Sequence, residues 1–219
     1  YQLLADDWSR KVLQNVVEYK LSGEIRLLRA CESNPREAWE NILKPSAEEH
    51  YMDLGAYTGD TIMEFIRYAG VWRRITALEP DSETFARLEK NTAALHDCIL
   101  YRLGAYSRYA RQPFAGGAGR GSHLAEDGVM TELDSVDNIL CGQSVSLINM
   151  DVEGMEAEAI TGMAKTLRRY RPKLLLAAYH RSEDLWRLPL EVLAIQPEYK
   201  VYLRHYPCLP AWDVNYYFV

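Results

Sequence analysis

The chain has 219 residues and a mass of 25.2 kDa, enough for one α/β domain with a small addition. Its net charge of −6 argues against a nucleic-acid surface as the main partner. No apolar run approaches the roughly 20 residues that span a bilayer. The four cysteines form no close pair, which is typical of reduced thiols. We therefore expect a cytoplasmic protein without a membrane segment, and the sequence does not indicate its oligomeric state.

The first part of the chain is predicted to be helical. A helical spacing of apolar residues ends near Gly23, and two short helices are expected over 24–31 and 36–43. Pro45 closes the last of them. The residues that carry the first helical spacing are Leu4, Trp8, Val12, Val16 and Tyr19. We expect residues 1–48 to form a helical cap that packs on a sheet or roofs a substrate cleft.

The segment 51–60, YMDLGAYTGD, predicts a buried strand, a tight turn and a helix. A short apolar run ends at Gly55, Gly59 closes the turn, and Asp60 or Thr61 is placed to cap the helix over 60–70. Glycine lets backbone amides come close to a ligand, and the first helical turn leaves N–H donors for an anionic group. This strand–turn–helix pattern is typical of the first part of a nucleotide-binding site in an α/β fold.

A second strand, over 75–79, ends in an acid. Glu79 lies roughly 24 positions after Gly55, close to the offset at which nucleotide folds place a carboxylate on the ribose hydroxyls. Charge-assisted hydrogen bonds to hydroxyls would be strong there. The alternative is that Gly55 and Gly59 only permit a tight turn and Glu79 is a solvated strand end.

The rest of the chain alternates strands with helices, which predicts a parallel sheet covered on both faces. Residues 107–128 interrupt the alternation and are expected to form a loop or a β-hairpin. The glycine cluster at 116–121 follows no apolar strand, so it does not predict a phosphate loop. The strands are expected over 98–103, 146–151, 173–180, 199–206 and 214–219, and the helices over 82–95, 155–169 and 184–195.

The end of the chain predicts an antiparallel hairpin. The connection between the last two strands is too short for a parallel crossover. Residues 49–219 are therefore expected to form a Rossmann-like, seven-stranded, mostly parallel sheet with a terminal antiparallel hairpin. A sheet with such a hairpin is unlike that of a nicotinamide-binding domain and resembles that of an S-adenosylmethionine-dependent methyltransferase.

Two segments, INMDVEGMEAEAITGMAKTL (148–167) and RPKLLLAAYHRSEDLWRLP (171–189), closely resemble the FkbM family of methyltransferases. DLGAYTGDT, the EPD after the second strand and TELDSV at 131–136 fit that family too. The likeness covers about residues 49–219. Tyr57 departs from the wider class, because it stands where the middle glycine of D-x-G-x-G-x-G is usual.

The resemblance implies S-adenosylmethionine as cofactor, held at the carboxyl ends of the strands. The methionine portion would lie against Asp53, Gly55, Ala56, Tyr57 and Gly59. Glu79 would bind the ribose hydroxyls, with Pro80 and Asp81 along the adenosine edge. Gly104 and Ala105 would lie along the adenine, and Asp151 beside the sulfonium.

The implied reaction is methylation of a hydroxyl group on a small molecule or saccharide. Either of two residues could be the general base. His180 ends the predicted fifth strand, and Asp151 could act as the base or could instead favour the cationic cofactor. Glu153 either belongs to the site or caps the following helix. The spacing of Asp151, Glu153 and His180 is not diagnostic of a metal site, and no metal is predicted.

Two other classes of function remain open. A nicotinamide-dependent oxidoreductase is disfavoured, because G-x-G-x-x-G is absent from the sequence and the terminal hairpin is expected. A non-catalytic binding module on a methyltransferase fold is compatible with the same sequence, since a fold does not fix a function.

Overall fold

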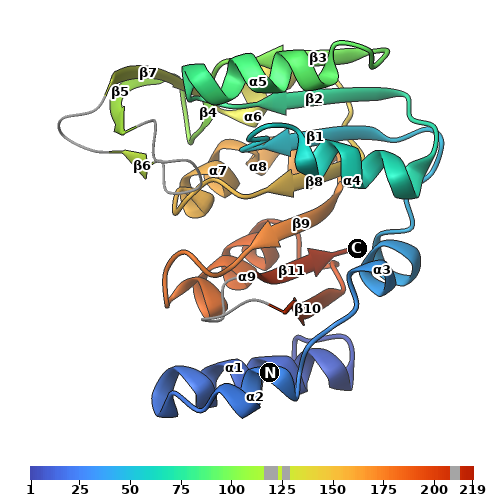
Figure 1. The fold of residues 1–219 in the computed structure, drawn as a ribbon, viewed down its shortest axis with the longest axis vertical. Coiled ribbons are helices and arrows are strands. Elements are labelled where there is room, and N and C mark those ends of the chain that lie inside the picture. Colours follow the sequence, from blue (N-terminus) through green and yellow to red (C-terminus); the bar gives the residue numbers. More distant parts are fainter. Residues whose placement is uncertain (116–122, 125–128, 208–212) are drawn as a thin grey trace. The chain divides into compact units, whose positions relative to one another are not determined.

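Seven strands form the main sheet of the protein, in the order β10-β11-β9-β8-β1-β2-β3. The computed structural model describes residues 1–115, 123–124, 129–207 and 213–219 (Figure 1). This order, with parallel pairs at β8-β1-β2-β3 and antiparallel pairs at the other end, confirms the predicted fold class. The chain divides into two compact units, Pro45–Pro172 and a unit formed by Tyr1–Lys44 with Lys173–Val219. The division into a 1–48 cap and a 49–219 domain stays a prediction.

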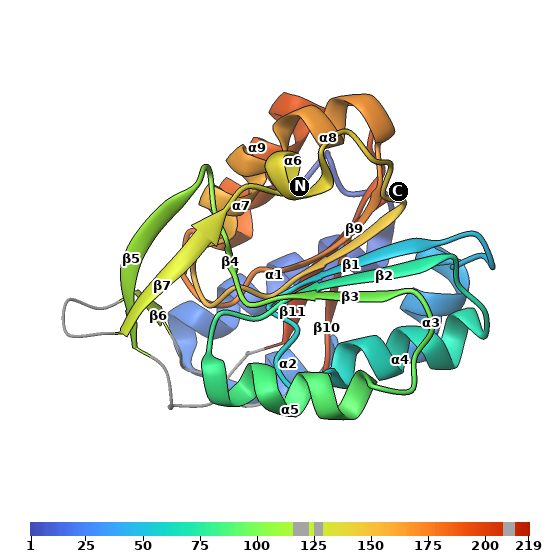
Figure 2. The same cartoon turned by 90° about the horizontal axis from the view of Figure 1, so that it is seen from above.

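The Pro45–Pro172 unit contains four parallel strands with helices on both faces. Figure 2 shows α4 and α5 on one face and α6 and α8 on the other. The strands are β1 (His50–Leu54), β2 (Arg74–Leu78), β3 (Cys98–Tyr101) and β8 (Leu147–Met150). The helices are α4 (Asp60–Ala69), α5 (Ser82–Thr92), α6 (Val136–Leu140), α7 (Glu156–Gly162) and α8 (Ala164–Tyr170).

Apolar side chains on the inner faces explain why these elements form where they do. All of β1 is buried, and Tyr51 stacks on Phe65 of α4 with ring centroids 4.2 Å apart. In α5, Leu88 is fully buried as expected, whereas Phe85, also predicted to face inward, is only half-buried. The helical periodicity therefore identified the face of each helix, but not the depth of every side chain on it.

The insertion after β3 is a second sheet. Its strands are β4 (Gly104–Ala105), β5 (Ala110–Ala115), β6 (His123–Leu124) and β7 (Val129–Asp134), in the order β4-β7-β5-β6. The antiparallel pair of β5 and β7 corresponds to the predicted hairpin. The glycine cluster at 116–121 lies outside the described residues. In Figure 1 this sheet lies on the side where β1, β2 and β8 end.

Several boundaries differ from the prediction; the fifth strand, for example, ends at Ala177 and not at His180. The third strand was expected to reach residue 103, but β3 ends at Tyr101 and the chain then starts the second sheet. The helix expected over 155–169 is divided at Met163 into α7 and α8. The carboxylate of Asp137 in α6 accepts the N–H groups of Lys165 and Thr166 at 3.0 and 2.8 Å, which gives α8 a separate capped start. Sequence reasoning missed α6, whose five residues are too few for a helical period.

The other unit joins both ends of the described chain. Strand β11 (Val214–Phe218) lies between β9 (Lys173–Ala177) and β10 (Val201–His205) and is antiparallel to both, so the hairpin prediction is confirmed. Helix α9 (Asp184–Ile195) has the predicted bounds. The N-terminal elements are α1 (Asp7–Ser22), α2 (Ile25–Arg29), α3 (Pro35–Glu37) and the π-helix η1 (Ala38–Leu43).

A buried arginine attaches the N-terminal helices to β10. Arg204 is 2% exposed, and its guanidinium donates to Asp6 at 2.8 Å, Glu37 at 3.0 Å and Ser9 at 2.9 Å. Burial acts to lower the pKa of Arg204, but the bonds to Glu37 and Asp6 outweigh it and raise the pKa. Ser9 also accepts the backbone N–H of Leu203 at 2.9 Å. The N-terminal helices thus contact β10 of their own unit through a buried polar cluster.

Two further observations bear on the sequence-based expectations. No helix among the described residues combines the length and the apolar character needed to cross a membrane. Cys31, Cys98 and Cys141 are free thiols, and Cys208 lies outside the described residues.

Arg204→Met should lower the free energy of unfolding by about 3 kcal/mol, because it leaves two carboxylates without their shared cation. Arg187→Met is the matched control, since Arg187 forms a surface ion pair with Glu191 whose loss should cost under about 0.5 kcal/mol. Urea unfolding of both variants provides the measurement. Equal losses would show that the Arg204 cluster contributes no more than a surface pair.

Candidate cofactor and active site

The predicted cofactor-binding residues lie at the carboxyl ends of β1, β2, β3 and β8, within the Pro45–Pro172 unit. The 55–59 turn follows β1, Glu79 follows β2, and Asp151 follows β8. Ligands of open α/β sheets bind at this edge. Because β1 lies between β2 and β8, all three connections start from neighbouring positions.

Gly55 brings the connections after β1 and β8 into contact. Its φ is +85°, and a β-carbon at this position would lie 2.0 Å from the carbonyl oxygen of Asp151. The N–H of Asp151 in turn donates to the carbonyl of Leu54 at 3.0 Å. Only glycine meets both the conformation and the contact. Gly55 therefore permits both the tight turn after β1 and the close packing of that turn on the connection after β8.

The N–H groups of the turn are largely bonded within the protein. Those of Gly55 and Ala56 donate to the carbonyl of Leu78 at 3.0 and 2.9 Å, and that of Gly59 donates to Ala56 at 2.8 Å. The sequence had suggested that backbone amides here approach a ligand. The structure directs these donors to the chain's own carbonyls, so they fix the shape of the turn.

The start of α4 differs from the sequence expectation. Gly59, at φ +91°, occupies the N-cap position, and no side chain caps the helix. Neither Asp60 nor Thr61 takes the predicted capping role. Thr61 instead donates its hydroxyl to Asp53 at 2.5 Å, because the tight turn places the first turn of α4 over the end of β1. Tyr57, at φ +48°, adopts the left-handed conformation that non-glycine residues visit rarely.

Asp53 is fully buried beneath this turn. Besides Thr61, its carboxylate accepts the side-chain amide of Asn149 in β8 at 2.8 Å and the hydroxyl of Tyr51 at 3.3 Å. Burial raises the pKa of Asp53 to about 6, although the bonds from Thr61 and Asn149 oppose this shift. These partners make Asp53 an anchor for β1, α4 and β8. Its direct contact with a cofactor stays a prediction.

Glu79 is the second buried carboxylate of the site. Its two oxygens accept the backbone N–H groups of Tyr57 at 3.0 Å and Asp81 at 2.9 Å. At 7% exposure it is not the solvated strand end of the alternative interpretation. Burial raises its pKa to about 7, against the effect of the two amides. Glu79 thus ties the turn after β1 to the connection after β2.

The remaining predicted residues around Glu79 form the next part of this edge. Asp81 caps α5 by accepting the N–H groups of Glu83 at 3.1 Å and Thr84 at 2.9 Å. Gly104 and Ala105 are buried in β4, and a β-carbon on Gly104 would lie 3.7 Å from that of Pro80. The connections after β2 and β3 are therefore adjacent, as a shared binding edge requires.

The D-V-E-G segment after β8 contains a tight turn, and the acid that holds it is Glu156 and not Glu153. Glu153 and Gly154 have φ values of +53° and +91°. The side chain of Glu156, which is 1% exposed, accepts the N–H groups of Val152 at 3.2 Å and Gly154 at 3.3 Å. Glu156, the first residue of α7, therefore ties this turn to the helix, whose N-cap residue Met155 makes no side-chain cap.

Three residues have roles in this site that sequence reasoning missed. They are Thr61, Asn149 and Glu156. Thr61 was expected only to cap the helix, and Asn149 lies within the segment 148–167 without a signal that pairs it with Asp53. Glu156 had a signal, because it is the last acid of the D-V-E-G-x-E segment.

Asp151 and His180, the two candidate bases, belong to different units. Asp151 is half-buried and directly follows β8. His180 is half-buried three residues after β9, with its ring centroid 4.4 Å from that of Tyr179 at an interplanar angle of 46°. The ring contact fixes the place of the imidazole within its own unit. The catalytic roles of both residues stay predictions.

Comparison with solved structures gives the same fold. Methyltransferase FkbM from Methylobacillus flagellatus KT is 27% identical with a TM-score of 0.85, and the match covers 100% of this chain and 56% of that protein. The chain therefore spans little more than half of that relative's length. No curated protein sequence matches the chain.

More distant structures share the fold alone. Aeropyrum pernix fibrillarin, solved with natively bound S-adenosyl-L-methionine, is 13% identical with a TM-score of 0.53, over 79% of this chain and 68% of its own. Precorrin-6y C5,15-methyltransferase from Geobacter metallireducens GS-15 is 14% identical with a TM-score of 0.52, over 84% of both chains.

The family comparison agrees with the resemblance read from the sequence. Residues 53–202 match the methyltransferase FkbM domain, a stretch that runs from the Asp53 anchor through the D-V-E-G turn to β10. With more than half of its length matched, the chain belongs to the FkbM methyltransferase domain family.

Proposed function

We propose that the protein is an S-adenosylmethionine-dependent methyltransferase that methylates a hydroxyl group of a small molecule or saccharide. The observation that carries the proposal is the buried Glu79 carboxylate, fixed by the backbone amides of Tyr57 and Asp81 at the edge where such folds bind ligands. Membership of the FkbM methyltransferase domain family supports it.

The residues present suit an adenosyl cofactor. Each carboxylate oxygen has two acceptor sites, so the amides of Tyr57 and Asp81 leave Glu79 able to accept a pair of ribose hydroxyls. The turn at Gly55 brings the chain close to Asp151 without an intervening side chain, which favours a ligand lying flat against this edge. Pro80, Gly104 and Ala105 would bound the adenine.

When bound, S-adenosylmethionine supplies an electrophilic methyl group. The protein's own task is then to hold an acceptor oxygen in line and to remove its proton. Positioning of this kind contributes up to about 7–11 kcal/mol in favourable model reactions. His180 is proposed as the base, since imidazole is suited to proton transfer near neutral pH. Asp151 would favour a cationic cofactor, or act as the base in place of His180.

Binding of S-adenosylmethionine and S-adenosylhomocysteine, but not NAD, should raise the melting temperature. At a ligand concentration of one hundred times Kd, the free energy of unfolding should rise by about 2.7 kcal/mol. Glu79→Ala should weaken this binding about 10–100-fold, because charge-assisted bonds to the ribose are lost. Glu89→Ala, on the exposed side of α5, is the control and should bind normally. A response to NAD instead would contradict the cofactor assignment, and unchanged affinity in Glu79→Ala would contradict the ribose role.

Affinity for S-adenosylhomocysteine should depend on pH through Glu79. Its pKa is raised to about 7, and the deprotonated form is the better acceptor of hydroxyl bonds. Affinity should therefore fall as the pH is lowered from about 8 to about 6. Isothermal titration of wild type and Glu79→Gln measures this, and the variant should lose that pH dependence. A wild-type affinity that stays constant over this range would exclude a titrating Glu79 from the binding site.

His180→Ala should lower turnover about 100-fold or more while cofactor affinity stays within twofold, because a base acts on the acceptor and not on the adenosyl group. The readout is S-adenosylhomocysteine formation on a panel of hydroxyl-bearing acceptors. His96→Ala, at an exposed histidine, is the control. Wild-type turnover in His180→Ala together with a large loss in Asp151→Asn would move the base role to Asp151. Cofactor binding without turnover on any acceptor would favour a non-catalytic module.

A further inference from the structure

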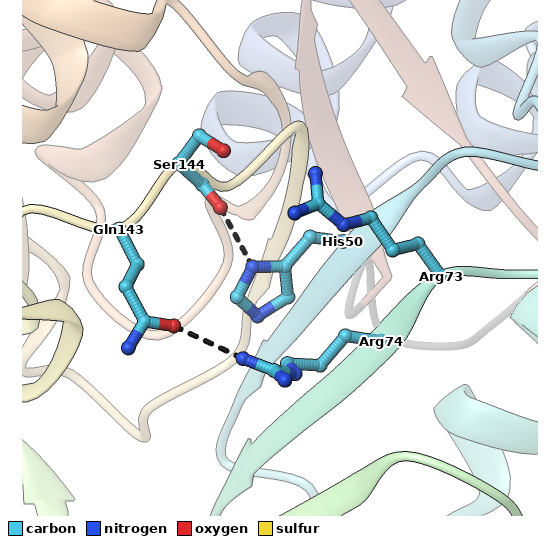
Figure 3. Close-up of a pocket in the computed structure, with 5 residues that line it drawn as sticks. All are labelled: His50, Arg73, Arg74, Gln143 and Ser144. Carbon is cyan, nitrogen blue, oxygen red and sulfur yellow. Dashed lines mark hydrogen bonds between the residues drawn. The ribbon is translucent and has the colours of Figure 1, made fainter.

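The Pro45–Pro172 unit has a hollow of about 410 Å³ at the edge opposite the candidate cofactor site (Figure 3). His50 and Arg74 are the first residues of β1 and β2, and Gln143 and Ser144 precede β8. Arg73 completes the lining. Because the three strands are parallel, their amino ends meet here and their carboxyl ends meet at the cofactor edge. This hollow is therefore a separate feature of the unit.

The strand starts hold the backbone of the two arginines in place. The carbonyl of Glu49 accepts the N–H groups of both Arg73, at 2.9 Å, and Arg74, at 3.2 Å. Across the hollow, the N–H of His50 donates to the hydroxyl of Ser146 at 3.0 Å, and the N–H of Ser146 donates back to the carbonyl of His50 at 3.1 Å. The elements that carry the lining side chains are thus hydrogen-bonded to each other.

A buried histidine forms the base of the hollow. His50 is 6% exposed, and its ring nitrogens are bonded to the carbonyl of Ser144 at 2.7 Å and the hydroxyl of Thr76 at 2.9 Å. Burial lowers the pKa of His50, and the charges of Arg74 and Arg73 act in the same direction, against the bond to Ser144. The imidazole is therefore neutral near pH 7, and the positive charge of the hollow comes from the arginines.

One of the two guanidinium groups has a neutral hydrogen-bond partner, and the other is exposed. Arg74 donates to the side-chain oxygen of Gln143 at 3.0 Å, and Arg73 is exposed beside the same hollow. In the described part of the chain, the ion pairs include neither arginine. The neighbouring carboxylate of Glu49 is bonded to the hydroxyl of Ser146, so the two adjacent cations make a local positive site on a protein whose net charge is −6.

We propose that this hollow binds a phosphate group, either free or as a monoester. The planar fork of a guanidinium matches the oxygens of a phosphate, and Arg73 and Arg74 would supply two such forks. Gln143 and Ser144 add neutral donors from the loop before β8. The volume falls within the roughly 300–1,000 Å³ of small-molecule sites, so it accommodates a phosphate with an attached group. The proposal does not rest on the methyltransferase function.

The test is binding of inorganic phosphate at constant ionic strength, measured by isothermal titration or by phosphorus NMR. Saturable one-site binding is expected for the wild type, with affinity at least tenfold lower in the double variant Arg73→Gln/Arg74→Gln. The matched control is Arg168→Gln/Arg169→Gln, an adjacent exposed pair in the same unit, whose affinity should stay within twofold. Arg73→Gln alone changes only an exposed side chain, so its expected loss of at least threefold does not depend on refolding.

A wild-type protein without saturable binding would overturn the proposal, as would equal losses in the two double variants. A second titration with methyl phosphate distinguishes the two sources of the group. Tighter binding of methyl phosphate would assign the hollow to a monoester, and tighter binding of inorganic phosphate to the free ion. Both of these outcomes support the proposal.

Discussion

The carboxylate of Asp53 is the point at which three elements of the candidate site meet. It is withdrawn from water, which disfavours its charged form, yet it accepts bonds from α4, from β8 and from its own strand. Those bonds determine where α4 can begin relative to the end of β1. The turn at 55–59 must then fit between two fixed ends, which is why glycine is required at Gly55 and why Tyr57 takes a left-handed conformation.

Glu79, which follows the adjacent strand β2, is a second carboxylate with a different role. Like Asp53 it has a raised pKa because of burial, but its partners are backbone amides in place of side chains. Backbone donors remain in place whatever the neighbouring side chains do. Asp53 thus shapes the core under the turn, and Glu79 orients the edge at which we propose the cofactor binds.

The sequence predicted the seven-stranded, mostly parallel sheet, the terminal hairpin and the approximate bounds of most elements, because apolar periodicity and short connections decide these locally. It could not predict that Met163 would divide a helix, since the cause is the carboxylate of Asp137, which lies in an element of its own. Site residues that belong to motif letters, such as Gly55 and Glu79, were found. Asn149 was not, because its partner is 96 positions away and only the parallel register of β1 and β8 brings the two together.

The position of β11 between β9 and β10 has a consequence for synthesis of the protein. The contact between Leu203 and Ser9 joins positions 194 residues apart, and β10 has no place in the sheet until β11 is present beside β9. The Pro45–Pro172 unit is continuous in sequence and needs no such late partner. On a ribosome, α1 would therefore emerge long before β10, the strand that it contacts in the folded unit.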